Sequence, residues 1–481
     1  MSSNNVISNF IWRFAERCGA QAVQFIVSIV LARLLMPEVY GTIALITVIT
    51  TILNVFVDSG MGTALIQKKD ADSVDFSTVF YFNMCVCIVL YVGLFICSPW
   101  IAYFYKDATL TPVIRVLGLT IVISGVKNIQ QAYVSKTMQF KRFFFSTLGG
   151  TIGAAVIGIW MAYKGFGVWA LVAQQIFNAM VDTLILWITV KWRPKKEFSF
   201  ERLKGLFSYG WKLLASSLLD TVYNNIRQLI IGRMYTPSDL AFYNRGKQFP
   251  DLIITNINTS IDSVLLPTMS QEQENKERVK IMTRRAIKTS TYIMAPLMMG
   301  LAFCATPIIR LILTEKWLSC VPFMQIFCIT SMFYPVHTAN LNAIKAMGRS
   351  DAYLKLEIIK KVIGMALLLS TMWFGVMAMA YSLLVSSVLS QIINSWPNRK
   401  LLNYGYLEQL KDILPGIILA VVMGICVYPV QWIGLSDIIT LCIQVPLGAI
   451  IYIIGSKIFK LESFEYILDM IKPYILKILH K

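Results

Sequence analysis

Five polar residues recur at helical spacing close to the start of this chain: Arg13, Arg17, Gln21, Gln24 and Ser28. Residues three or four positions apart share one face of an α-helix. The residues around them are largely apolar, as in a membrane span, where an ionisable group at the centre costs about 2.5–3.5 kcal/mol on translocon scales. Such groups are candidates for function. Guanidinium groups pair well with phosphate, so this face is suited to an anionic substrate.

A second stripe repeats almost the same spacing: Lys212, Ser216, Asp220, Asn224 and Arg227. A third apolar segment carries Asn244, Gln248, Asp251, Thr255, Asn258 and Asp262 on one face, with Lys247 beside it. Another segment has a thinner face of Thr47, Thr51, Asn54 and Asp58, and two more add Lys127, Asn128 and Gln131, and His337, Asn340 and Lys345. One interpretation is that the stripes line a shared hydrated cavity. The other is interhelical hydrogen bonding and helix capping. For Asp58 and Asp262, which lie near the outer ends of their helices, the two interpretations fit equally well.

The motifs of soluble enzymes are missing from the sequence. No GxxxxGK[ST] loop is present, so we expect no ATP-driven step in this chain. No pair of carboxylates lies in a loop large enough to enclose a sugar, which argues against a glycosyltransferase. His337 and His480 have no triad context, and we interpret His337 as a buried hydrogen-bonding side chain. The nine cysteines form no CxxC pair. We therefore expect no enzyme, no metal site and no cofactor.

Membrane-spanning helices must position the stripes. The chain has 481 residues, of which 56% are hydrophobic and only 15% charged, and this balance excludes a soluble protein. Runs of about 20 apolar residues are long enough to cross a bilayer. They predict an all-α integral membrane protein with fourteen spans, at residues 10–35, 39–66, 77–104, 110–134, 143–163, 167–190, 205–233, 239–266, 287–313, 320–346, 353–374, 376–397, 412–431 and 436–457. The tail, 459–481, is predicted to lie in the membrane interface.

Loop charges predict the orientation. Loops after even-numbered spans, together with the C-terminal tail, carry 30 Lys and Arg residues, whereas loops after odd-numbered spans carry three. Positive charge marks the cytoplasmic side, so both termini are predicted to be cytoplasmic. The same bias accounts for the net charge of +18 without any nucleic-acid partner.

An internal repeat predicts two lobes. The pattern Thr51-x-x-Asn54-x-x-x-Asp58 returns as Thr255-x-x-Asn258-x-x-x-Asp262, and Arg33-x-x-x-Pro37 returns as Arg233-x-x-x-Pro237. An offset of six spans keeps the two copies parallel. We expect an N-terminal lobe at 1–192, a C-terminal lobe at 203–398 and two additional helices at 411–458.

Three segments resemble the Wzx-type, WzxC-like polysaccharide transporters of the multidrug/oligosaccharidyl-lipid/polysaccharide exporter superfamily. They are Phe10-Ile11-Trp12-Arg13-Phe14, the stretch from Leu31 to Gly41, and the stretch from Asp58 to Gln67. The resemblance extends over essentially all fourteen spans. It implies a V-shaped pair of six-helix lobes plus two C-terminal helices. It also implies a flippase in the bacterial cytoplasmic membrane that moves undecaprenyl-pyrophosphate-linked oligosaccharides by alternating access, for O-antigen, capsule or exopolysaccharide assembly.

The resemblance also suggests roles for residues in spans one, two, seven and eight. The pyrophosphate would bind cationic side chains: Arg13, Arg17, Lys212, Arg227 and Lys247. Polar residues would line the cavity: Gln21, Gln24, Asn54, Asp58, Asn224 and Asn258. The membrane potential could drive export, or carboxylates such as Glu16, Asp220 and Asp262 could exchange H⁺ or Na⁺. The expected partners are the lipid-linked oligosaccharide, membrane lipids, and a polysaccharide polymerase with other assembly proteins.

Three alternatives stay open at this stage. A small-molecule exporter of the same superfamily, or a major-facilitator carrier, would also span the membrane many times. A large outer loop would favour an integral-membrane glycan polymerase or ligase, and the sequence has no such loop. A non-transporting scaffold of a glycan assembly complex would tolerate loss of Arg13, Arg17 and Lys212.

Overall fold

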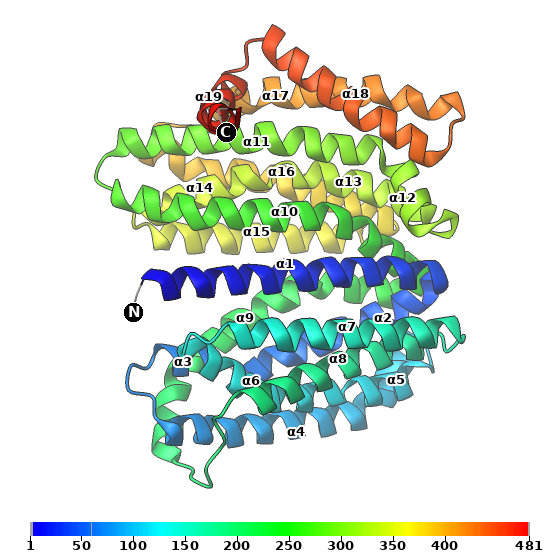
Figure 1. Cartoon of the computed structure of the whole chain (residues 1–481), viewed down its shortest axis with the longest axis vertical. Coiled ribbons are helices and arrows are strands. Elements are labelled where there is room, and N and C mark those ends of the chain that lie inside the picture. The colour runs from blue at the N-terminus through cyan, green and yellow to red at the C-terminus, as the bar shows by residue number, and fades with distance from the viewer. Residues whose placement is uncertain (1–2, 59, 480–481) are drawn as a thin grey trace. The chain divides into compact units, whose positions relative to one another are not determined.

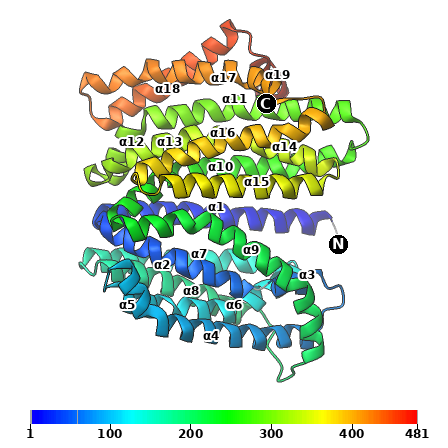
Figure 2. The same ribbon diagram turned by 180° about the vertical axis from the view of Figure 1, so that it is seen from behind.

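The computed structural model describes residues 3–58 and 60–479, apart from the side chains of residues 3–11, 13–18, 209, 470, 471 and 473–479. The chain forms two compact units, Met1–Ala241 and Phe242–Lys481. Figures 1 and 2 show that both units are built from long helices, as predicted.

The first unit contains nine helices and the start of a tenth. They are α1 (Ser3–Leu34), α2 (Pro37–Asp58), α3 (Met61–Gln67), α4 (Ser73–Tyr105), α5 (Leu110–Leu117), α6 (Leu119–Lys136), α7 (Lys141–Tyr163), α8 (Val168–Thr189), α9 (Phe200–Met234) and α10 (Pro237–Gln271). Helix α7 lies between α1 and α8, and α6 contacts both α4 and α8. Helix α9 packs along α2, α3 and α4.

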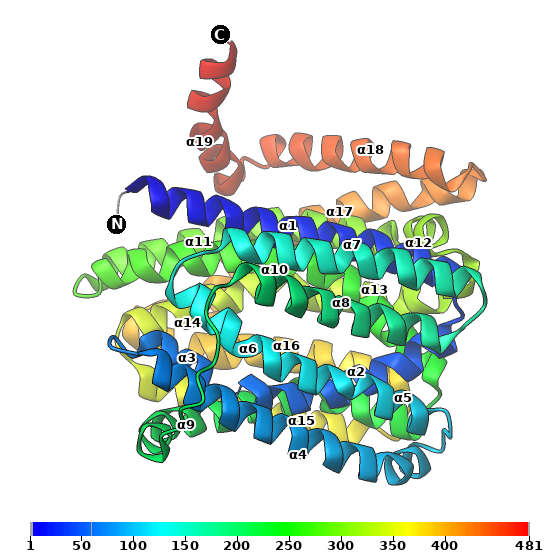
Figure 3. The same cartoon turned by 60° about the horizontal axis from the view of Figure 1, so that its bottom comes forward.

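The second unit continues α10. It contains α11 (Lys276–Phe303), α12 (Ala305–Leu313), the 3₁₀ helix η1 (Glu315–Cys320), α13 (Val321–Ser331), α14 (Tyr334–Ala346), α15 (Ser350–Thr371), α16 (Val376–Leu401), α17 (Tyr406–Val427), η2 (Tyr428–Ile433), α18 (Asp437–Ile458) and α19 (Glu462–Leu479). Helix α11 packs mainly on α17, which pairs with α18. The Tyr452 hydroxyl of α18 also donates to the Tyr292 carbonyl of α11 at 2.9 Å. Figure 3 shows α19 leaving the end of α18 at a steep angle.

The multi-span helical class is confirmed. Every predicted span coincides with helix, although five of them are broken, as where α2 gives way to α3. Among the described residues, nine helical segments are long and apolar enough to cross a membrane, or ten if the pair α11–α12, bent by 67°, is one span. The full count of fourteen stays a prediction. Three of the helices below this threshold, α1, α9 and α10, carry the densest polar stripes.

The break between α2 and α3 has a local cause. Gly60 adopts the left-handed conformation, with φ of +66°, and a Cβ atom there would lie 2.4 Å from the Gly210 carbonyl oxygen of α9. A side chain at this position would meet both backbone strain and a clash. The glycine therefore lets the end of α2 turn while α9 stays in close contact.

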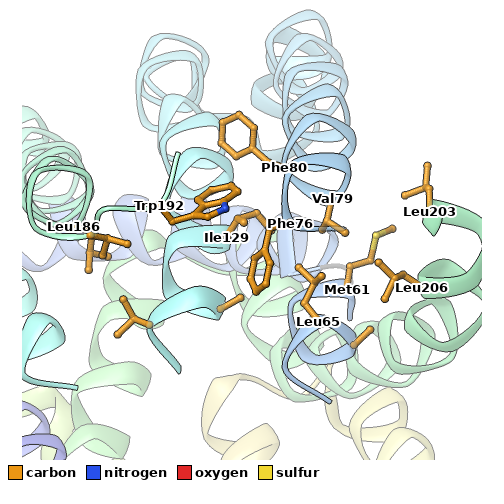
Figure 4. Close-up of a cluster of buried hydrophobic side chains, with 14 of the residues drawn as sticks. Met61, Leu65, Phe76, Val79, Phe80, Ile129, Leu186, Trp192, Leu203 and Leu206 are labelled. Carbon is orange, nitrogen blue, oxygen red and sulfur yellow. The ribbon is translucent and has the colours of Figure 1, made fainter. Parts of the chain in front are cut away.

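The N-terminal part of α9 is held by a hydrophobic cluster (Figure 4). Leu203 and Leu206 of α9 join Met61 and Leu65 of α3 and the buried side chain of Phe76 of α4. All five side chains are less than a tenth exposed. Burial on this scale stabilises a domain by about 1.5–3 kcal/mol for each large side chain. The cluster therefore fixes where α9 begins.

An ion pair adds to this attachment. Asp72 caps α4 by accepting from the backbone N–H groups of Val74 and Asp75 at 3.0 Å. Its carboxylate also accepts from the Arg202 guanidinium of α9 at 2.5 Å. The Arg202 hydrogen bond, with the backbone donors, lowers the pKa of Asp72 to about 2. The carboxylate is therefore charged at neutral pH, and the start of α4 and the start of α9 stay linked.

We predict that Gly41→Ala destabilises the first unit. A Cβ atom at Gly41 of α2 would lie 1.8 Å from the carbonyl oxygen of Pro237, at the start of α10, so backbone would have to move. Overpacking of this kind costs about 1–3 kcal/mol. Gly93→Ala in α4 is the matched control because no atom lies within 4 Å of its added carbon. Thermal unfolding in detergent should show a lower midpoint for Gly41→Ala alone, and equal midpoints would contradict the close contact.

Candidate functional site

The predicted stripe on α9 forms a polar exposed face in the first unit. Lys212, Ser216, Asp220 and Asn224 are all exposed, and Arg227, near the C-terminal end of the stripe, is partly buried. They lie one turn apart, so the structure brings the stripe together as predicted. An exposed polar face on a membrane helix has to meet water, another protein surface or a polar ligand, because lipid tails satisfy none of its groups.

A cavity of about 530 Å³ lies beside this face, between α9 and the helices α2, α3 and α6 of the same unit. Its polar lining includes Asp58, Thr63, Asn128, Gln131, Ser135, Ser217 and Thr221. Asn128 donates to the Val57 carbonyl at 2.8 Å, so it both ties α6 to α2 and borders the cavity. The cavity offers oxygen and amide groups with few fixed charges. That chemistry is suited to hydroxyl-rich ligands or to water.

The predicted residues of α2 differ in their surroundings. Asp58 is exposed and borders the cavity, at the last residue of the helix. Asn54, one turn earlier, is partly buried, and its Oδ1 atom has no hydrogen-bond partner among the described residues. Of the two, Asp58 is therefore the one that a ligand in this cavity could reach.

An ion pair inside the first unit joins a predicted residue to one that sequence reasoning missed. Lys127 of α6 binds Asp182 of α8 at 2.9 Å, with the two side chains only 21% and 12% exposed. Asp182 is the lone charged residue of its span, and that isolation was the available signal. The pair satisfies both charges locally, so we interpret Lys127 as structural rather than ligand-binding.

The stripe on α10 is described within the second unit. Lys247 lies 3.9 Å from Asp251, one turn further along, so its charge is partly balanced. Asn258 is partly buried, and Asp262 is exposed. Several neighbouring hydroxyl groups bond to their own helix, such as that of Thr259, which donates to the Thr255 carbonyl at 2.6 Å.

His337 is a hydrogen-bonded side chain, as interpreted from the sequence, but it is only partly buried. Its Nε2 atom lies 3.3 Å from the Ser387 hydroxyl, and its Nδ1 atom lies 3.2 Å from the Asn394 amide. Close by along α14, the Asn340 amide donates to Gln409 at 2.9 Å, and Asn340 accepts from the Asn398 amide at 2.7 Å. These bonds link α14 to α16 and α17 through polar contacts.

The stripe on α1 is only partly visible. Gln21 is partly buried and Gln24 is exposed. The side chains of Arg13, Glu16 and Arg17 lie outside the described residues, so their roles stay predictions.

Comparison with known proteins identifies the family. A family profile described as polysaccharide biosynthesis protein matches residues 30–322, which is more than half of the chain. The chain belongs to this polysaccharide biosynthesis protein family. This match, together with the relatives described next, which include a WzxC protein, confirms the predicted resemblance to Wzx-type transporters.

Relatives of this family member come from several bacteria. The teichuronic acid biosynthesis protein TuaB of Bacillus subtilis (strain 168) is 24% identical over 84% of this chain and 85% of its own length. The succinoglycan biosynthesis transport protein ExoT of Rhizobium meliloti (strain 1021) is 22% identical over 75% and 73%. The lipopolysaccharide biosynthesis protein WzxC of Escherichia coli (strain K12) is 22% identical over 76% and 74%.

Solved structures show the same fold. The lipid II flippase MurJ in an inward closed conformation matches 95% of this chain and 99% of its own, with a TM-score of 0.74 at 15% identity. An inward-facing multidrug resistance MATE transporter of the MOP superfamily matches 80% of this chain and 94% of its own, with a TM-score of 0.61 at 13% identity. At these identities the likeness establishes the fold of this family member and nothing further.

We predict that Asp182→Ala destabilises the protein by about 3–5 kcal/mol, because it leaves Lys127 charged and unpaired inside the helix bundle. The Lys127→Ala/Asp182→Ala double variant should lose much less than the two single variants together. Thermal unfolding of the four proteins in one detergent completes the cycle. Strictly additive losses would show that the two side chains do not interact.

Proposed function

We propose that this protein is a flippase. It moves undecaprenyl-pyrophosphate-linked oligosaccharides from the cytoplasmic to the outer leaflet of a bacterial cytoplasmic membrane, for surface polysaccharide assembly. The exposed polar face of α9 carries the proposal, because Lys212, Asp220 and Asn224 are exposed along a helix in the fold of a membrane transporter. A charged, hydrogen-bonding headgroup is a ligand that such a face would accommodate.

The relatives favour a substrate that is recognised by its lipid pyrophosphate rather than by one particular sugar. TuaB, ExoT and WzxC act in the biosynthesis of teichuronic acid, succinoglycan and lipopolysaccharide, which are three different polymers. A lipid pyrophosphate is a chemical group that such pathways can share. In this protein, Lys212 and Arg227 are proposed to bind the pyrophosphate together with Arg13, Arg17 and Lys247. The amide side chains of Gln21, Gln24, Asn54, Asn224 and Asn258 are proposed to contact the glycan.

Alternating access between the two repeats is the proposed mechanism. When the inside of the membrane is negative, moving a negative charge outward is favourable by about 2.3 kcal/mol per charge per 100 mV. The potential alone could therefore drive net export. Exchange of H⁺ or Na⁺ at Glu16, Asp58, Asp220 or Asp262 is the proposed alternative drive. With the basic loops inside, both termini are cytoplasmic, and a polysaccharide polymerase would receive the exported unit.

We predict that cells lacking this protein accumulate one complete lipid-linked oligosaccharide, measurable by mass spectrometry of extracted lipids. Lys212→Ala should restore export about tenfold less well than the wild type, because a charge-assisted hydrogen bond to phosphate is lost. Lys212→Arg should recover most of the activity. Lys204→Ala is the matched control, since Lys204 is also exposed on α9 but lies outside the stripe.

Each outcome of this experiment separates two interpretations. Accumulation in the deletion strain with normal export by Lys212→Ala would keep the flippase and remove the proposed site. No accumulation, with surface polysaccharide unchanged, would contradict the flippase and favour export of small molecules.

A further inference from the structure

Two adjoining cavities lie in the second unit, where α11 meets α17 and the turn between α18 and α19. Their volumes are about 200 and 380 Å³, and both are lined by Lys288, Glu462 and Ser463. Figures 1 and 3 show α19 next to this end of α11 and α17. The segments that meet here are among the basic loops predicted to be cytoplasmic.

The two carboxylates that line these cavities are already paired. Asp412 of α17 accepts from the Arg284 guanidinium at 2.8 Å and lies 3.8 Å from the Lys288 ammonium. It also accepts from the Tyr404 hydroxyl at 2.8 Å. Glu462 forms an ion pair with Lys288, and the hydrogen bond from Lys288 lowers the pKa of Glu462. Both carboxylates are therefore neutralised by cations of the protein itself.

Three cations around the cavities remain without such a partner. Arg285, Lys411 and Lys460 are exposed, and none has a carboxylate within ion-pair distance in the part of the chain that the structure describes. Arg285 instead stacks its guanidinium over the Tyr466 ring of α19, 4.8 Å from its centre. This leaves a concentration of positive charge that an anion would balance.

An apolar row begins where these cations end. Leu414, Ile418, Val422 and Ile425 of α17 are all exposed, and they follow Lys411 at helical spacing on one face. Helix α17 is one of the segments apolar enough to cross the membrane. A ligand that fits both features has an anionic group at the membrane surface and hydrocarbon chains that run along the helix. Free phosphate would use only the first feature.

We propose that this surface binds an anionic phospholipid of the bilayer. Its phosphate would lie among Arg285, Lys411 and Lys460, and its acyl chains would follow the apolar row of α17. Basic pockets between helices on the cytoplasmic side suit lipid headgroups of this kind, and each nearby lysine or arginine adds to the attraction. The proposal does not depend on the flippase activity, because none of these residues belongs to the polar stripes.

Lipid titration of the full-length protein in detergent, followed by native mass spectrometry, tests the proposal. Phosphatidylglycerol should bind about tenfold more tightly than phosphatidylcholine with the same acyl chains. The Lys411→Gln/Lys460→Gln variant should lose about tenfold in phosphatidylglycerol affinity, as expected from removing two charges near the headgroup. Lys195→Gln/Lys196→Gln, which removes two exposed charges from the first unit, is the matched control and should bind like the wild type.

Several outcomes would overturn the assignment. Unchanged binding by the Lys411/Lys460 variant, or an equal loss in the control variant, would show that the lipid binds elsewhere or by general surface charge. Displacement of phosphatidylglycerol by millimolar inorganic phosphate would assign the site to free phosphate instead. If the double variant does not fold, two other measurements decide. Arg285→Gln should weaken phosphatidylglycerol binding, and the wild-type protein should bind phosphatidylglycerol more tightly than phosphatidylcholine; failure of either would contradict the proposal.

Discussion

A polar side chain inside a membrane has to find water or a polar partner, and this constraint organises the protein. Two solutions are present in the first unit. Lys127 and Asp182 pair across α6 and α8 and neutralise each other away from the surface. Lys212, Asp220 and Asn224 instead remain exposed along α9. The first arrangement stabilises a helix bundle, whereas the second requires the exposed face to meet water, another protein surface or a polar ligand. The proposed function follows from that difference.

The fold maintains the exposed face by anchoring α9 on other parts of its surface. Leu203 and Leu206 are buried against α3 and α4, and Arg202 is held by the carboxylate of Asp72. Gly60 lets the end of α2 pass close to the α9 backbone. These contacts use apolar groups, backbone and a local ion pair, and they involve none of Lys212, Asp220 and Asn224, which stay exposed. The cavity bordered by Asp58 is lined from α9 by Ser217 and Thr221, each of which follows a stripe residue in the sequence.

Much of this fold follows from hydropathy and spacing alone. Apolar runs predict helices at every span, and intervals of three and four residues are enough to place the α9 stripe on one face. Tertiary contacts are beyond that reasoning. The partner of Lys127 could not be deduced, because pairing depends on how α6 and α8 pack. The turn at Gly60 was missed since a single glycine inside an apolar run carries little weight. The internal repeat assigned α9 to the C-terminal lobe, and only packing reveals its contacts with α2, α3 and α4.

Cysteine accessibility tests the central claim most directly, in intact cells and inverted vesicles that carry a chain with its nine native cysteines replaced by alanine. The Asp220→Cys and Asn224→Cys variants are compared with Val156→Cys, which replaces an apolar side chain that is 65% exposed well inside α7. If the α9 face meets water, a membrane-impermeant thiol reagent should label the two α9 variants in at least one preparation and leave Val156→Cys unlabelled in both. Absence of labelling at both α9 positions, with the proteins present and folded, would contradict the account.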